Sequence, residues 1–258
     1  MIELVDVRLD HPRGGEPLVS EANLKVTRGE VVMIVGAAGV GTSRLVAAAL
    51  GEVPASAGRI EVMGRDLTKL RRASLRLLRR RVGIVPQDLC LLADRSVQVN
   101  VALPLEIDGL PRSMTIVRAN EVLATLGLAS EASLPIDCLS AAERQRVAVA
   151  RALVREPELV IADHPTSLQD AAGAELVCSV LAAAGARGAA VIVLGRDPAL
   201  IDIAEQHGWR QLALAGGKLG PLHEADLGRL VAEPEPPVEH DIPNIVPFPL
   251  SARTAGVA

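Results

Sequence analysis

Short apolar runs alternate with longer helical patterns along this chain. Uninterrupted apolar runs are typical of buried strands, and they predict strands at 31–35, 82–85, 159–162 and 190–194. Two further strands are predicted at 3–9, where the alternating pattern is typical of a half-buried strand, and at 59–63. Residues rich in Ala and Leu predict helices at 42–50, 141–154 and 171–184. Buried strands separated by helices indicate an α/β domain with a parallel sheet.

Two regions depart from this alternation. Between Gln87 and Leu139 the pattern changes to helices and loops without a buried strand, which predicts an inserted helical subdomain. We therefore expect a core of 1–87 and 155–230 with a helical subdomain at about 88–154. Beyond it, six prolines from Glu233 onward predict a disordered or extended Pro-rich tail over 231–258. A solvated tail is the favoured interpretation, and a docking peptide in IPNIVPFPL is the other.

Length and composition exclude several classes of protein. A chain of 258 residues can bury one full core. No apolar run reaches the roughly 18 residues of a membrane span, and the start MIELVDVRLDHP lacks a basic segment followed by an apolar one. We expect no secretion signal and a cytoplasmic location. Cys90, Cys138 and Cys178 have neither metal-ligand nor redox spacing, and we expect small buried side chains.

Charge and aromatic content argue against a nucleic-acid partner. The formal net charge is -4, and one Trp, one Phe and no Tyr cannot form a base-stacking surface. The arginine-rich segment 69–81 is compatible with an anionic partner, but its interspersed leucines are typical of a half-buried helix with a solvated face. We infer no nucleic-acid role.

The stretch GAAGVGTSR, residues 36–44, carries the first candidate chemistry. It follows the strand VVMIV and opens a helix, which is the context of a phosphate-binding loop. Glycines 36, 39 and 41 would let backbone N–H groups and the helix dipole approach phosphate oxygens. Ser43 offers a hydroxyl to Mg²⁺. Taken alone, the stretch fits a nucleotide site and a tight strand-to-helix turn equally.

Further segments decide between these alternatives. Residues 54–66, 82–88, 139–153 and 159–170 occur in order with the loop, and together they resemble the nucleotide-binding domain of ABC ATPases over about residues 1–230. Within that superfamily, residues 79–107 look most similar to the cell-division ATPase FtsE, and next to lipoprotein-release and macrolide-export ATPases. The resemblance implies a P-loop (RecA-like) parallel sheet core with N-terminal antiparallel strands, ATP with Mg²⁺ as cofactor, and head-to-tail dimers.

The resemblance assigns roles to individual positions. It implies a metal site at Ser43, Gln87 and Asp163, with Asp170 supporting the loop geometry. The residues implied to contact the nucleotide are Gly36, Gly39, Gly41, Thr42, Ser43, Arg44, Gln87 and Ser140.

Three departures from the family pattern concern the terminal phosphate. Thr42 stands at the lysine position and His164 at the position of the glutamate that polarises water. Arg196 stands at the switch-histidine position, where a γ-phosphate contact and an ordinary exposed arginine are equally open interpretations. Arg44 could in principle reach back toward the phosphates, although neighbouring helix residues point in different directions.

The signature segment LSAAERQ also departs from the family. Ala141 and Ala142 replace paired glycines, while Ser140, Glu143 and Gln145 remain. Ser140 with Glu143 also satisfies a capping box, so a structural role is as well supported as a phosphate role. His11 stands near the position of an adenine-stacking aromatic.

These substitutions lead to two functional hypotheses. The first is an FtsE-like subunit on the inner face of the cell membrane, a pseudo-ATPase that docks an FtsX-like membrane protein in cell division or envelope remodelling. The second is an active ATP-hydrolysing subunit powering division or the export of lipoproteins or small molecules, through Arg44, His164 and Arg196 or through an intact partner. Whether ATP binds, and whether the dimer is a homodimer or a heterodimer, is open in both.

Overall fold

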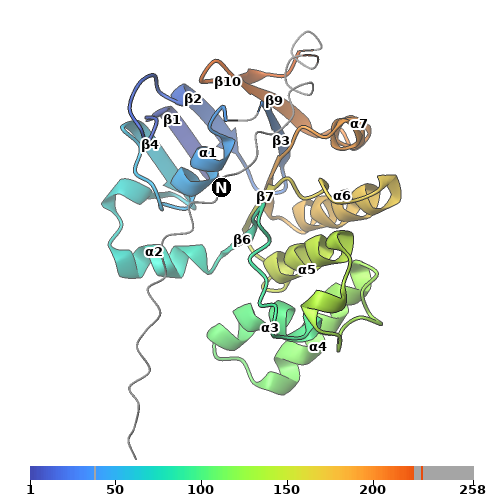
Figure 1. Cartoon of the computed structure of the whole chain (residues 1–258). Helices are drawn as coiled ribbons and strands as arrows, with labels where there is room; N and C mark the ends of the chain where they lie inside the picture. Colours follow the sequence, from blue (N-terminus) through green and yellow to red (C-terminus); the bar gives the residue numbers. More distant parts are fainter. Residues whose placement is uncertain (38, 224–227, 229–258) are drawn as a thin grey trace, which may run out of the picture.

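The chain folds around two β-sheets, which a computed structural model describes for residues 1–37, 39–223 and 228 (Figure 1). The predicted Pro-rich tail lies outside the described residues. In the described ranges, one sheet has six strands in the order β10-β9-β3-β8-β7-β6, and the other has four in the order β2-β1-β4-β5. This confirms the predicted α/β fold class, with a mainly parallel core and antiparallel N-terminal strands.

The six-stranded sheet is parallel except at one edge, where β10 pairs antiparallel with β9. Strands β3, β8, β7 and β6 follow the predicted apolar runs, and β9 and β10 were not predicted. The strands are β3 (Val31–Gly36), β6 (Val82–Val85), β7 (Leu159–Asp163), β8 (Ala190–Leu194), β9 (Arg210–Ala215) and β10 (Lys218–Pro221).

The four-stranded sheet is antiparallel, and β1 lies between β2 and β4. Two of its strands match predictions, while β2 and the short β5 were missed. Its strands are β1 (Ile2–Leu9), β2 (Val19–Val26), β4 (Ala57–Val62) and β5 (Arg65–Asp66).

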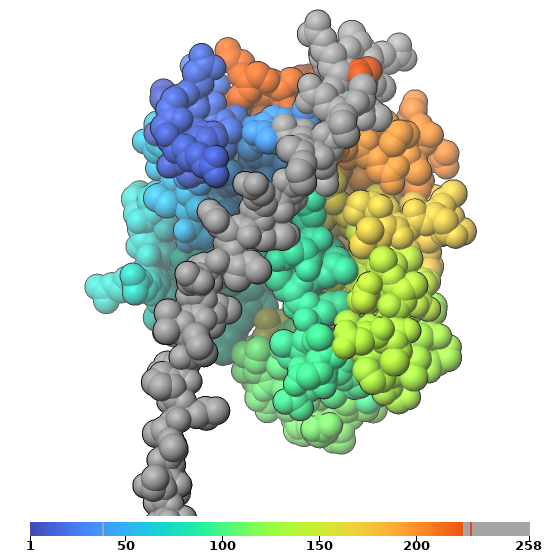
Figure 2. All heavy atoms as spheres, viewed as in Figure 1, coloured from blue at the N-terminus to red at the C-terminus, as the bar shows by residue number. Residues whose placement is uncertain are grey.

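Helices flank both sheets. The helices predicted at 42–50, 141–154 and 171–184 are confirmed, and the region between Gln87 and Leu139 contains helices and no strand, as expected. The α-helices are α1 (Thr42–Ala49), α2 (Arg72–Arg79), α3 (Val97–Ile107), α4 (Arg112–Thr125), α5 (Ala141–Leu153), α6 (Ala171–Ala186) and α7 (Pro198–Gln206). In the space-filling view, the green to lime segment that contains α3, α4 and α5 forms one end of the molecule (Figure 2). None of the helices in the described ranges is both long and apolar enough to cross a bilayer.

Alternation along the parallel strands divides the apolar core in two. Met33 and Val35 of β3 face a cluster that includes α5 and α6, whereas Val32 and Ile34 face a cluster with β1, β2 and α1. Neighbouring side chains of a strand point to opposite faces, so a strand covered on both faces reads as one continuous apolar run.

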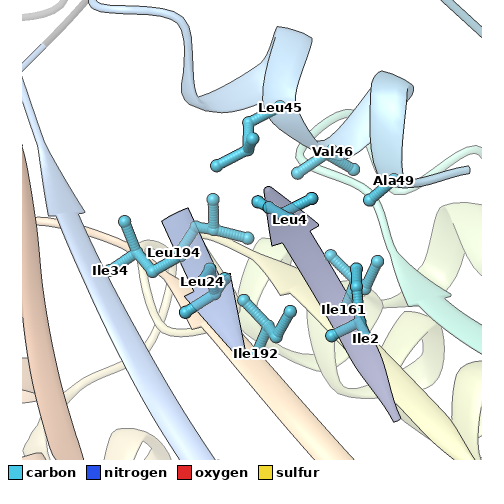
Figure 3. Close-up of a pocket in the computed structure, with 10 residues that line it drawn as sticks. All are labelled: Ile2, Leu4, Leu24, Ile34, Leu45, Val46, Ala49, Ile161, Ile192 and Leu194. Carbon is cyan, nitrogen blue, oxygen red and sulfur yellow. The ribbon is translucent and has the colours of Figure 1, made fainter. Parts of the chain in front are cut away.

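The second cluster leaves a small apolar cavity of about 20 Å³. Figure 3 shows its lining side chains converging from α1, from the small sheet and from the large sheet. A void of this size without polar groups is a packing defect of the core and offers no binding chemistry.

The cysteines differ from expectation. Cys178 on α6 is buried, but Cys90 and Cys138 are exposed. Both exposed residues lie outside the sheets and long helices, in a loop and in the short 3₁₀ helix Ile136–Cys138, where local apolar pattern does not determine burial.

Candidate functional site

The glycine-rich stretch joins β3 directly to α1, as predicted. Gly39 and Gly41 adopt φ values of 76° and 108°, in the left-handed region that disfavours residues with a Cβ. Gly41 is the N-cap residue of α1, where the structure has no side-chain cap hydrogen bond and no acidic residue in the first turn. The first N–H groups of α1 therefore face outward without a side-chain acceptor, as an anion site requires.

Gly36 has a different reason to be glycine. A Cβ at this position would lie 2.7 Å from Cγ2 of Thr42, so the Thr42 methyl packs onto the end of β3. Thr42 thereby fills space beside the loop without offering a cation to a phosphate.

The carboxyl ends of four neighbouring strands meet at one edge of the large sheet. Gln87 follows β6, Asp163 ends β7, Arg196 follows β8, and Gly36 ends β3. Open α/β sheets bind ligands at this edge. The topology thus places four sequence-predicted positions side by side.

An open groove of about 600 Å³ lies at this edge. Ser43, Gln87 and Asp163 all line it, together with Asp88 and Cys90. Three oxygen donors, from a hydroxyl, an amide and a carboxylate, suit a hard divalent cation such as Mg²⁺. The donor set therefore fits the metal implied by the family resemblance. In the described ranges, no group of three His, Cys, Asp or Glu side chains forms a separate metal site.

His164 lies against Asp163 at the end of β7. Its Nδ1 is 2.9 Å from Oδ1 of Asp163, and both side chains are largely buried. Its backbone adopts φ 50°, its N–H donates to the Leu194 carbonyl, and its carbonyl accepts from Nε2 of Gln145 at 2.8 Å. The predicted base position is therefore held by β8 on one side and by α5 on the other.

The two arginines named from sequence lie at different places around the loop. Arg196 follows Gly195, whose N–H donates to the Ile34 carbonyl, so it leaves β8 beside the end of β3. Arg44 lies close enough to Asp10, which follows β1, to act on its carboxylate. Arg8 is the main cause of the lowered pKa of Asp10, and the charge of Arg44 contributes weakly. Arg44 thus acts electrostatically on the end of β1.

Ser140 caps α5, as its capping box predicts. Its Oγ accepts from the Glu143 N–H at 3.2 Å, and the Glu143 carboxylate accepts from the Ser140 N–H at 2.7 Å. Hydrogen bonds from the Ser140 side chain, and then from its backbone, lower the pKa of Glu143. The described groove residues do not include Ser140, so one chain does not bring it to the phosphate loop.

Two other sequence candidates have local structural roles. Asp170 is the N-cap of α6, where its Oδ1 accepts from the Gly173 N–H at 2.8 Å. His11 follows β1, and its Nδ1 accepts from the Arg13 N–H at 3.1 Å.

Sequence reasoning missed the residues that shape the loop after β6. Leu89 and Cys90 both have positive φ, and Arg151 of α5 donates to both of their carbonyls. Asn100 of α3 is fully buried and exchanges hydrogen bonds with the backbone of Leu92. An asparagine inside an otherwise apolar helix was a sequence signal that could have pointed to the contact between Asn100 and Leu92. Leu89 and Cys90 carried no sequence signal for their positive φ values.

Comparison with known proteins places this geometry in a family. Residues 19–167 match the family model described as ABC transporter. The methionine import ATP-binding protein MetN of Brucella abortus is 32% identical over 239 residues, which is 92% of this chain and 63% of that protein. MetN of Rhizobium etli is 38% identical over 170 residues, or 66% of this chain and 46% of that protein.

Solved structures agree. The dimeric ATP-binding cassette MJ0796, in a post-hydrolysis state bound to ADP and Pi, superposes with a TM-score of 0.77 at 27% identity, covering 86% of this chain and 99% of that one. The cbiO1 protein of Clostridium perfringens, part of a cbiONQ ABC transporter complex, gives 0.72 at 26% identity, covering 85% and 88%.

These matches correct the functional expectation. The relatives are methionine import ATP-binding proteins, so the predicted place in cell division, as an FtsE-like pseudo-ATPase docking an FtsX-like protein, is wrong. The chain spans 46% to 63% of the length of these two relatives. A family model that matches most of the chain, on a phosphate loop and groove at the expected sheet edge, shows that the chain belongs to the ABC transporter ATPase family.

Proposed function

We propose that this chain is an ATP-hydrolysing subunit of an ABC transporter that moves a small polar solute of the amino-acid class. Similarity to methionine import ATP-binding proteins over 92% of the chain supports the solute class. The single observation that carries the ATPase assignment is the groove that Ser43, Gln87 and Asp163 share beside the phosphate loop. The nucleotide-binding unit comprises residues 1–230, with a core of 1–87 and 155–230 and a helical subdomain at about 88–154.

The residues of this chain have distinct tasks toward ATP and Mg²⁺. The outward N–H groups at the start of α1 and the loop glycines hold phosphate oxygens. Ser43, Gln87 and Asp163 hold the cation. Mg²⁺ bound by these residues would draw negative charge from the phosphate oxygens and so favour attack of water at the terminal phosphorus, with ADP as the leaving group. Arg196 supplies positive charge at the same sheet edge, where Thr42 offers none.

His164 handles the proton of the attacking water in this proposal. An ionised carboxylate only accepts hydrogen bonds, so the contact with Asp163 makes Nδ1 the donor. The neutral ring then accepts a proton at Nε2. Asp163 thereby orients the imidazole, as a carboxylate does in other histidine-based sites.

The active unit is a dimer on a membrane partner. The dimeric ATP-binding cassette MJ0796 supports this arrangement. In a head-to-tail dimer, the start of α5 at Ser140 would face the phosphate loop of the second copy, with Ala141 and Ala142 beside it. The chain is then peripheral to an integral membrane permease on its cytoplasmic side, as a homodimer or with a second ABC subunit.

Phosphate release from ATP by the purified chain, alone and with its co-expressed permease, tests the ATPase assignment. We expect Mg²⁺-dependent turnover that Asp163→Asn abolishes. Asp94→Asn is the matched control, because Asp94 is an exposed carboxylate paired only with Arg95 among the described ion pairs. Turnover that is absent with the permease present, or insensitive to Asp163→Asn, would refute the assignment. Methionine uptake into vesicles holding the complete transporter tests the solute class.

A further inference from the structure

The side chain of Arg151 joins α5 to the loop that carries Gln87. Its Nη1 donates to the Cys90 carbonyl and its Nη2 to the Leu89 carbonyl, both at 2.5 Å. Loss of solvation in this position lowers the pKa of Arg151. The planar guanidinium presents its N–H donors in a fixed fork, so one side chain holds two successive carbonyls in one geometry. We call these two hydrogen bonds the Arg151 clasp.

The clasped carbonyls belong to an unfavourable backbone conformation. Leu89 and Cys90 have φ values of 59° and 45°, and neither is a glycine. In this region the Cβ approaches the backbone carbonyl too closely, so such residues persist only where their surroundings hold them. Other hydrogen bonds here lie within the loop itself, from Leu89 N–H to Pro86 and from Cys90 Sγ to Asp88. The Arg151 clasp is a hold from outside the loop.

The helix that bears Arg151 is closely docked on the preceding strand. A Cβ on Gly83 of β6 would lie 2.3 Å from the carbonyl oxygen of Ala152, the residue after Arg151. The backbones of β6 and α5 are therefore in direct contact. Arg151 is thus fixed relative to the strand whose end the loop leaves.

The same helix also contacts the loop after β7. Gln145 donates to the His164 carbonyl and to Ser167 Oγ, and its Oε1 accepts from the Leu168 N–H. One helix thus anchors the loop of Gln87, which lines the groove, and the loop of His164, which directly follows the groove residue Asp163.

We propose that Arg151 is a positioning residue, whose clasp holds Leu89 and Cys90 in their left-handed conformation and thereby places Gln87 in the groove beside Ser43 and Asp163. The proposal rests on the proposed function, because it gives Gln87 a task at Mg²⁺. Without the clasp, Leu89 and Cys90 relax toward extended backbone and Gln87 leaves its position.

Cys90 provides a readout that needs no nucleotide. Its thiol donates to Asp88 Oδ1 at 2.9 Å, and loss of solvation followed by this hydrogen bond raises its pKa to about 11. Thiol labelling should therefore be slow while the loop is clasped. The experiment uses the full chain with Cys138→Ser, since Cys138 is also exposed while Cys178 is buried. Labelling of Cys90 by a maleimide is followed over time by mass spectrometry.

In this background, we expect Cys90 of the Arg151→Met variant to react with maleimide at least tenfold faster than Cys90 of the parent. The rate in the Arg151→Lys variant should lie between these two, because a lysine ammonium does not present the fixed pair of donors that binds two successive carbonyls. Arg155→Met is the matched control. Arg155 follows α5 and donates to the Pro104 carbonyl and to Asp108, away from the Leu89 carbonyl. It should leave Cys90 labelling unchanged. Melting temperatures establish that each variant is folded. If the Arg151→Met variant is not folded, the labelling rate of the Arg151→Lys variant takes its place in the test.

A second measurement separates positioning from simple loop stability. Calorimetry compares ATP binding with Mg²⁺ and with EDTA. Arg151→Met should weaken binding at least fivefold with Mg²⁺ and leave it unchanged with EDTA. Unchanged labelling in a folded variant would overturn the clasp. Faster labelling with unchanged Mg²⁺-dependent affinity would overturn the positioning of Gln87. If the parent chain binds no nucleotide in either condition, the proposed function fails together with the positioning of Gln87, and labelling still decides the clasp.

Discussion

The imidazole Nδ1 of His164 lies 2.9 Å from Oδ1 of Asp163, so the last residue of β7 and the first residue of the following loop form a hydrogen-bonded pair. Both side chains are largely buried, at 15% and 8% exposure. A buried pair at the carboxyl end of a central strand is held in one geometry.

His164→Ala tests the histidine of this pair. We expect ATP turnover by the complete transporter to fall by on the order of 10²-fold, the lower range for loss of a general base. His164→Glu should retain or raise turnover, because a carboxylate is then available to the water. His207→Ala is the control, since His207 pairs with Glu175 on α6. Equal turnover in the His164→Ala variant and the parent would show that His164 does not act as the base.

Thr42→Lys should strengthen ATP binding. The threonine methyl packs onto Gly36 and supplies no charge, whereas a lysine ammonium reaches the phosphates. A charge-assisted hydrogen bond contributes about 1.5–3 kcal/mol, or roughly a tenfold to hundredfold lower Kd. Calorimetry measures the change. Thr42→Met controls for side-chain length without charge, and an equal gain from methionine would contradict an electrostatic cause.

Gly83→Ala should destabilise the fold, because the new methyl group meets the carbonyl of Ala152 at 2.3 Å and the ring of Pro157 at 2.8 Å. Backbone atoms cannot move aside cheaply, and overpacking of this kind costs about 1–3 kcal/mol. Urea unfolding measures the free energy. Gly220→Ala in β10 has no atom within 4 Å of the new Cβ and should change stability by less than about 0.5 kcal/mol. Similar losses in both variants would argue against close packing of α5 on β6.

The capping box of α5 should give a pH-dependent contribution to stability. The pKa of Glu143 is lowered from its ordinary value of 4.5, so its stabilisation is fully present above pH 4.5 and is lost as pH falls through the lower, folded-state pKa. Ser140→Ala should cost about 1 kcal/mol at neutral pH and less in acid. Urea unfolding of the variant and the parent at neutral pH and well below pH 4.5 gives both differences. A difference independent of pH would mean that the Glu143 carboxylate does not take part in the cap.

Much of the fold follows from local pattern. The apolar runs at 31–35 and 190–194 indicated buried strands because strands covered on both faces need no polar positions. The hairpin of β9 and β10 at the edge of the sheet was not predicted. Gly216 and Gly217 lie between these two strands, both with positive φ, and this glycine pair is a turn signal in the sequence. The candidate site residues followed from the resemblance of several motifs, in order along the chain, to those of a known family. The transport assignment, in contrast, needed the comparison with relatives.

The sequence alone determined that a phosphate would bind where a strand of the parallel sheet ends and a helix begins. The spacing of the glycines and the change from strand to helix are local properties of the chain. It also located Ser43, Gln87 and Asp163 as candidate metal ligands. Only the tertiary structure decided how Arg151 and Gln145 anchor the loops around that edge, because each acts on a backbone distant in sequence. Hydrogen bonds of this kind depend on which segments the fold brings together, and no local pattern encodes them.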